Sequence, residues 1–148
     1  NIDGGTTTGQ GASLTVPLGD MSLVVSSSQM DVGGTEDSSA GGALTMTAGG
    51  GTLSLGVETT SGDTAATEGE AYSVSYSTTM GSAAVAVGYS GYDANSTTSS
   101  RTDVTLSQSI GGGASVFAEF QNLTGAGVAA EGNSTSESVV AIGTSVSF

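Results

Sequence analysis

Apolar and polar residues alternate with a period of two along nearly the whole chain. In the C-terminal segment 138–148, Val140, Ile142, Val146 and Phe148 occupy one set of alternate positions, and small or hydroxyl-bearing residues dominate the other. Successive side chains of a β-strand point to opposite faces of the sheet, so this pattern predicts strands. The same argument predicts nine strands, at about 11–17, 21–30, 42–48, 52–59, 71–79, 82–92, 101–110, 114–123 and 138–148.

The connections between these strands are of two kinds that follow one another in turn. The short connections are rich in glycine and predict tight hairpin turns, at 17–20, 48–51, 79–82 and 110–113. The others are polar and acidic and predict long loops, at 31–42, 59–70, 93–100 and 124–137. The chain is therefore expected to be an all-β, antiparallel, up-and-down meander with its short turns on one side.

This rhythm favours a transmembrane β-barrel, whose strands turn apolar residues to lipid and small or polar residues to the lumen. Such barrels have short periplasmic turns and long outer loops, and their tilted strands need about 9–11 residues to cross. Aromatic girdles are expected at both interfaces, with Tyr72, Tyr92 and Phe120 at the long-loop side and Met80 and Phe148 at the other. A soluble acidic β-sandwich that acts as a binding module also alternates, and stays open as an alternative.

Composition narrows the possible functions. The chain of 148 residues has 14 acidic residues and a single cation, Arg101, and it lacks histidine and cysteine. Nucleic-acid binding is not expected, because phosphate contacts need Lys and Arg. An enzyme is not expected either, since the usual His base, Cys nucleophile and Lys amine are absent. No cofactor is predicted, and no apolar run is long enough for a transmembrane helix.

Two C-terminal segments resemble a known family. The segments SIGGGASVFAEFQNLTG and VVAIGTSVSF resemble the last two strands of general bacterial outer-membrane porins, with the sixteen-stranded trimeric alphaproteobacterial type as the nearest match. The resemblance implies a passive diffusion channel in the outer membrane of a Gram-negative bacterium, assembled as a homotrimer in lipid. It also implies that the outer-membrane assembly machinery reads the last strand, with Val140, Ile142, Val146 and Phe148 as the signal.

The direction of the strands raises a question about the start of the chain. If Phe148 lies on the periplasmic side, counting backwards places the first strand with its start outside, and the strand number is odd. Bacterial single-chain barrels have an even number of strands. The chain is therefore expected to be the C-terminal half of a sixteen-stranded barrel, with about seven strands upstream.

Two sets of residues are candidates for function. Charged or polar residues at lumen positions are pore-lining candidates: Glu58, Arg101, Asp103, Glu119 and Gln121. Their alternative role is that of solvated rim charges. Acids in the long loops predict an acidic mouth that concentrates cations: Asp31, Glu36, Asp37, Asp63, Glu68, Glu70, Asp93, Glu131 and Glu137. Cation preference is therefore expected, and loop oxygens such as those of TEDSS (35–39) could hold calcium.

A structural role is the main alternative to transport. Long alternating strands with low internal charge can stack in cross-β layers, so a surface filament or an amyloid-like fibril also fits the pattern.

Overall fold

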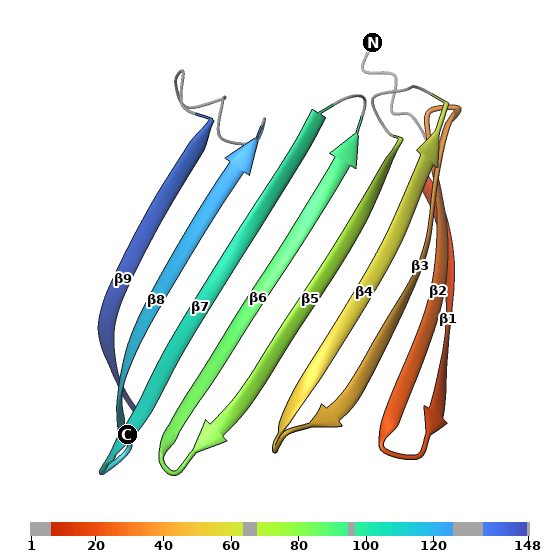
Figure 1. The fold of residues 1–148 in the computed structure, drawn as a ribbon. Helices are drawn as coiled ribbons and strands as arrows, with labels where there is room; N and C mark the ends of the chain where they lie inside the picture. The colour runs from red at the N-terminus through yellow and green to blue at the C-terminus, as the bar shows by residue number, and fades with distance from the viewer. Residues whose placement is uncertain (1–6, 64–67, 95–96, 126–134, 148) are drawn as a thin grey trace.

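A computed structural model of the chain describes residues 7–63, 68–94, 97–125 and 135–147. They form one antiparallel sheet in which each strand pairs with its neighbours in sequence (Figure 1). The strands are β1 (Thr7–Leu18), β2 (Met21–Val32), β3 (Thr35–Ala48), β4 (Gly51–Gly62), β5 (Gly69–Met80), β6 (Ala83–Ala94), β7 (Thr97–Gly111), β8 (Ala114–Gly125) and β9 (Ser136–Val146). The predicted up-and-down meander is confirmed. These residues include no helix long and apolar enough to span a membrane.

The four predicted short turns all lie at one end of the sheet, at the bottom of Figure 1. Each joins two strands through two residues, and the β3–β4 turn shows why glycine is needed. Gly49 and Gly50 have φ angles of 57° and 80°. A two-residue hairpin turn with positive φ at both positions matches the twist of the flanking strands, and only glycine adopts it without strain.

The opposite end of the sheet differs from the prediction. Segment 31–42 is not a long loop, because β2 continues to Val32 and β3 begins at Thr35, with a two-residue turn at Gly33 and Gly34 between them. Most other strands also extend further toward this end than predicted. Polarity alone was misleading here, because Ser and Thr pair well in strands whose two faces both meet water.

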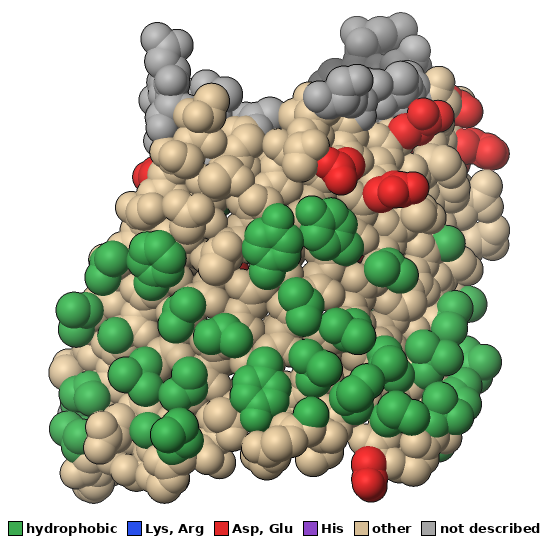
Figure 2. Space-filling model, viewed as in Figure 1, with side chains coloured by type: hydrophobic (Ala, Val, Ile, Leu, Met, Phe, Trp, Pro, Cys, Tyr) green, Lys and Arg blue, Asp and Glu red, His purple; other side chains and the backbone are tan. Residues whose placement is uncertain are grey.

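The register assigns every paired residue to one of two faces. Leu55 pairs with Leu44 and Val74, whereas the adjacent Ser54 pairs with Thr45 and Ser75. Cross-strand partners share a face, so one face is mainly apolar and the other carries mostly small and hydroxyl-bearing side chains, with a few large apolar ones such as Phe117 and Val139. Figure 2 shows the apolar face, which is the convex side of the curved sheet.

The apolar face has no partner layer among the described residues. Ile142 is 81% exposed and Leu14 is 64% exposed, and no side chain of the described segments is fully buried. A β-sandwich would cover this face with a second sheet. The described residues form a single sheet, so the sandwich interpretation is wrong for this fold.

The apolar residues cover only the part of the convex face nearest the short turns (Figure 2). In β5 they run from Tyr72 to Met80, about 27 Å along the strand at ~3.4 Å per residue. A tilt of about 40° reduces this to ~21 Å, near the ~25 Å of an outer-membrane apolar band. Beyond it the same face is polar, with Gln10 bonded to Gln29 and Ser38 to Ser61. The strands therefore continue past the apolar band as a polar collar.

Candidate functional site

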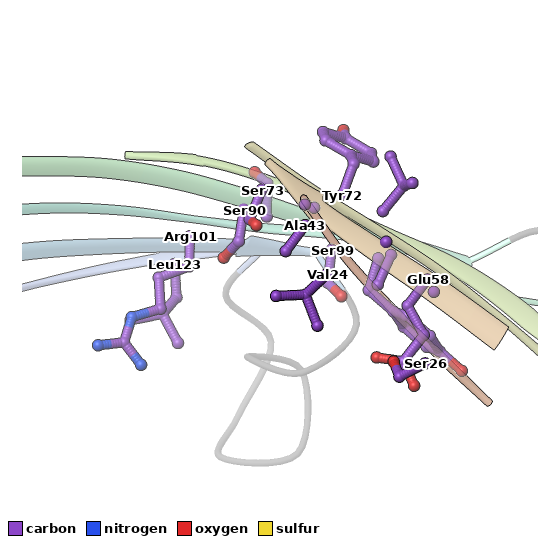
Figure 3. A pocket seen from close by; sticks show the side chains of 18 of the residues that line it. Val24, Ser26, Ala43, Glu58, Tyr72, Ser73, Ser90, Ser99, Arg101 and Leu123 are labelled. Atoms are coloured by element: carbon purple, nitrogen blue, oxygen red, sulfur yellow. The ribbon is translucent and has the colours of Figure 1, made fainter. Parts of the chain in front are cut away.

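The five pore-lining candidates all lie on the concave face of the sheet. Arg101 pairs with Ser90 and Leu123, and Glu58 shares their face through the intervening strands. In Figure 3, Glu58 and Arg101 lie on one side of the sheet and Tyr72 on the other. The register gives the same assignment to the remaining candidates, which are Asp103, Glu119 and Gln121.

Four of the five candidates gather on β7 and β8. The Nε of Arg101 donates to both carboxylate oxygens of Asp103, at 2.8 and 3.0 Å. Gln121 lies directly opposite Asp103, and its Nε2 donates to Glu119 at 3.4 Å. Such an exposed ion pair contributes only ~0.2–1 kcal/mol to stability, but the carboxylate of Asp103 offsets the charge of the chain's one Arg or Lys side chain.

Glu58 stands apart from this polar cluster. It lies on β4, opposite Gly41 and Ala71, whereas Arg101 and Asp103 lie three strands away on β7. Within the described ranges, its carboxylate has no hydrogen bond or ion pair. The concave wall thus carries two separate charged places rather than one compact site.

Between them the concave face is hollowed. The hollow is open and has a volume of about 560 Å³, with glycines and alanines such as Gly41, Ala43, Gly56 and Ala71 along its floor and Val24 and Leu123 beside them (Figure 3). Glycine and alanine leave this space because they place little or no side chain above the sheet. The glycines and alanine of this floor are visible in the sequence as the run GGA at 41–43, but most of that run was predicted to be the end of a loop.

Tyr92 corrects the predicted girdle. It pairs with Ala71 and Ser99 on the concave face, so it cannot belong to a lipid-facing ring of aromatics. Tyr89, three residues earlier in β6, faces outward instead, and its ring centroid lies 6.0 Å from that of Tyr72. Positions 89 and 92 are three residues apart in one strand, so their side chains must point to opposite faces, and this could have been recognised from the sequence.

Other aromatics do mark the limits of the apolar band. Tyr72 and Phe120 lie on the convex face toward the long-loop end. Tyr76 lies nearer the short turns, where its hydroxyl contacts the carbonyl oxygens of Ala48 and Gly49 at 3.2 and 3.3 Å. A phenol with an apolar ring and a bonded hydroxyl is typical of a membrane interface.

The predicted acidic mouth is divided between the two faces. Asp31 lies directly opposite Glu36, and Glu70 directly opposite Asp93, all on the convex side of the collar. These acids lie in strands rather than in loops, which corrects the prediction. Asp37 and Glu137 lie on the concave side, Glu68 and Asp63 flank the β4–β5 connection, and Glu131 falls outside the described residues.

Two of these carboxylates accept hydrogen bonds from backbone N–H groups. The Oδ1 of Asp31 accepts from the N–H of Gly34 at 2.8 Å, and the Oδ2 of Asp63 accepts from the N–H of Glu36 at 3.0 Å. Glu36 and Asp37 point to opposite faces of β3, so the TEDSS segment cannot direct both carboxylates at one ion. Calcium binding elsewhere in the collar stays a prediction.

The residues of the predicted assembly signal lie on β9, an edge of the described sheet. Val140, Ile142 and Val146 point outward and are 68%, 81% and 53% exposed. The strand runs toward the short-turn end, as predicted, and the N–H of Ser147 bonds to the carbonyl of Gly113 at 2.9 Å. Phe148 lies outside the described residues.

No protein-family model and no curated protein sequence matches the chain. Solved structures do match. OmpTΔL8, a loop L8 deletion mutant of OmpT, an outer membrane protein of Vibrio cholerae, superposes with a TM-score of 0.73 at 14% identity over 97% of this chain and 54% of its own. The KdgM porin, solved with disordered oligogalacturonate, superposes with a TM-score of 0.56 at 12% identity, over 96% of this chain and 75% of the porin. A BenF-like porin from Pseudomonas fluorescens superposes with a TM-score of 0.62 at 11% identity, over 80% of this chain and 43% of the porin.

The chain spans about half the length of the V. cholerae protein. Identities this low carry information on fold rather than on substrate. The apolar convex face, the polar concave face and these neighbours agree on one architecture. The chain has the fold of an outer-membrane β-barrel wall of the porin-like kind.

Proposed function

We propose that the chain forms part of a passive diffusion channel in the bacterial outer membrane, open to small hydrophilic solutes and ions. The observation that carries this proposal is the division of the sheet into an apolar convex face and a concave face rich in hydroxyl groups. In lipid, the first faces the acyl chains and the second lines water. In such a channel, the radius of the pore and the fixed charges on its wall decide which solutes pass, and no energy source is coupled to transport.

Cation preference is the finer part of the proposal. On the concave face, the charge of Arg101 is matched by Asp103, whereas Glu58, Glu119 and Glu137 add negative charge that no second Lys or Arg balances. A wall of one sign concentrates the opposite ion. The KdgM porin was solved with an anionic sugar chain; the present wall has no unpaired cation in the described segments to hold such a solute.

The oligomer and the assembly route are also proposals. The C-terminal resemblance supports a sixteen-stranded trimer of the alphaproteobacterial type. The outward-facing Val140, Ile142 and Val146 on β9 suit recognition by the outer-membrane assembly machinery. An enzymatic role finds no support, because the chain lacks the His, Cys and Lys side chains that ordinary acid–base and nucleophilic chemistry uses.

Conductance across a planar lipid bilayer tests the function. The full-length protein is inserted from detergent, and current is recorded in KCl, first in equal solutions and then across a tenfold gradient. We expect stepwise ohmic currents and a reversal potential of the sign that K⁺ selectivity gives. Selectivity should weaken near 1 M salt, where the Debye length falls to ~3 Å. Folded protein that inserts without conducting would contradict the proposal.

A further inference from the structure

The outer edge of the Tyr92 ring, with its hydroxyl, Cζ and Cε2, lies over Gly69 of the neighbouring strand on the concave wall. A Cβ placed on Gly69 would lie 2.6 Å from the Tyr92 hydroxyl oxygen and 2.7 Å from its Cζ. Glycine therefore leaves the space that the ring occupies. Tyr92 is still 40% exposed and lines the hollow, so part of its ring is open to a ligand there.

Free hydroxyl groups surround this ring. Ser90 lies two residues before Tyr92 on the same face, Ser99 lies directly opposite it, and Ser73 lies directly opposite Ser90. All three line the hollow, and their hydroxyls have no hydrogen-bond partner in the part of the chain that the structure describes. The hollow thus combines one exposed aromatic face with several hydroxyls free to bond a ligand.

The local charge selects against an anionic ligand. Arg101 lies on the strand next to Tyr92, but both carboxylate oxygens of Asp103 already accept from its Nε. Glu58 belongs to the same cross-strand row as Tyr92, through Ala71. A carboxylate or phosphate on the ligand would therefore meet a hollow in which the charge of Arg101 is offset by Asp103 and Glu58 adds a further negative charge.

We propose that Tyr92 is a stacking platform for a neutral pyranose sugar at the mouth of the channel. A pyranose presents an apolar C–H face and a rim of hydroxyls. The first fits the exposed ring, and the second fits the serine hydroxyls beside it. Tyr92 lies three residues beyond Tyr89 toward the long-loop end, so it meets a solute before the membrane-spanning part of the wall does. This inference rests on the proposed function, in which the concave face meets water.

Covering a glycine is not by itself a sign of binding. On the convex face the ring of Tyr72 lies over Gly91 in the same manner, and there it faces the membrane side. That pair provides a control, because it also places a tyrosine ring over a glycine but on the opposite face. What distinguishes Tyr92 is that its ring lies on the concave side, beside the free hydroxyls, whereas the Tyr72 ring lies on the other side of the sheet (Figure 3).

Saturation-transfer NMR on the full-length protein in detergent micelles tests the proposal without requiring conduction. The probes are maltotriose, the anionic trigalacturonate, and mannitol, a polyol that lacks a ring face. We expect transfer to the ring C–H protons of maltotriose and little to the other two probes. Tyr92→Leu should weaken maltotriose binding by about tenfold, Tyr92→Phe should retain most of it, and Tyr72→Leu should leave it unchanged.

A second variant moves the ring without removing it. Gly69→Ala places a methyl group where the Tyr92 ring lies, so it should lift the ring and weaken binding nearly as much as Tyr92→Leu does. Circular dichroism would show whether each variant keeps its strands. If wild type fails to bind maltotriose, or if folded Tyr92→Leu binds it as wild type does, the inference is wrong. A conducting channel that ignores maltotriose would overturn this inference alone, whereas a folded protein without conductance would overturn the proposed function.

Discussion

Leu55 and Ser54 are neighbours in β4 that face opposite ways, so the same substitution at each tests which face meets lipid. Leu55 is 39% exposed and lies between Leu44 and Val74 on the convex face. Arginine at the midplane of the lipid face of a barrel costs ~2–4 kcal/mol. Leu55→Arg should therefore raise the equilibrium constant for unfolding by about 30- to 900-fold, since ~1.4 kcal/mol is a factor of ten.

Ser54→Arg should cost far less. Ser54 faces the concave wall opposite Thr45 and Ser75, where a long side chain can extend into water. Surface substitutions of this kind usually stay within about 0.5 kcal/mol. Reversible urea unfolding in lipid vesicles, followed by tyrosine fluorescence, measures both variants. With a slope of ~2 kcal/mol per molar urea, the midpoint of Leu55→Arg should fall by about 1–2 M. Equal shifts for the two variants, or a larger shift for Ser54→Arg, would refute the assignment of faces.

Three further predictions concern the wall and the last strand. Arg101→Ala should increase cation selectivity, because it frees the negative charge of Asp103, and Asp103→Asn should reduce it; bilayer reversal potentials of equal value for the two variants would contradict this. Tyr76→Phe should lower the free energy of unfolding by about 1–2 kcal/mol, because its hydroxyl loses its contacts with the β3–β4 turn; an unchanged urea midpoint would count against the contact. Ile142→Asp should prevent assembly in cells, measured as the amount of folded protein in outer-membrane fractions, whereas normal levels would rule out β9 as the recognised strand.

Most of the fold could be predicted from the alternation of apolar and polar residues in the sequence. A period of two predicted the existence of the nine strands and the faces of most of their residues, with Tyr92 as an exception, because a sheet with lipid on one side has apolar side chains at alternate positions. The glycine-containing short turns could be predicted for a similar reason, since few residues tolerate positive φ. Both signals are local, and the sheet is built from neighbours in sequence.

Strand ends and the site were harder to predict. The DVGGTEDSS segment looked like a loop because it is polar, yet it forms the ends of β2 and β3 beyond the apolar band. Polarity reports what a residue faces rather than whether its backbone is paired. The hollow beside Tyr92 depends on register across β4 to β7, which joins Glu58 to Ser99 through two intervening strands. No pattern within one strand contains that information.

The central claim is that adjacent residues of one strand meet lipid and water in turn. The chain has no cysteine, so single spin labels can be placed at Val74→Cys and Ser75→Cys without other changes. Electron paramagnetic resonance in lipid vesicles then compares collisions with oxygen, which concentrates in lipid, and with a water-soluble nickel chelate. The account predicts that the label at 74 collides mainly with oxygen and the label at 75 mainly with the chelate. Equal access of the chelate to both labels would contradict it.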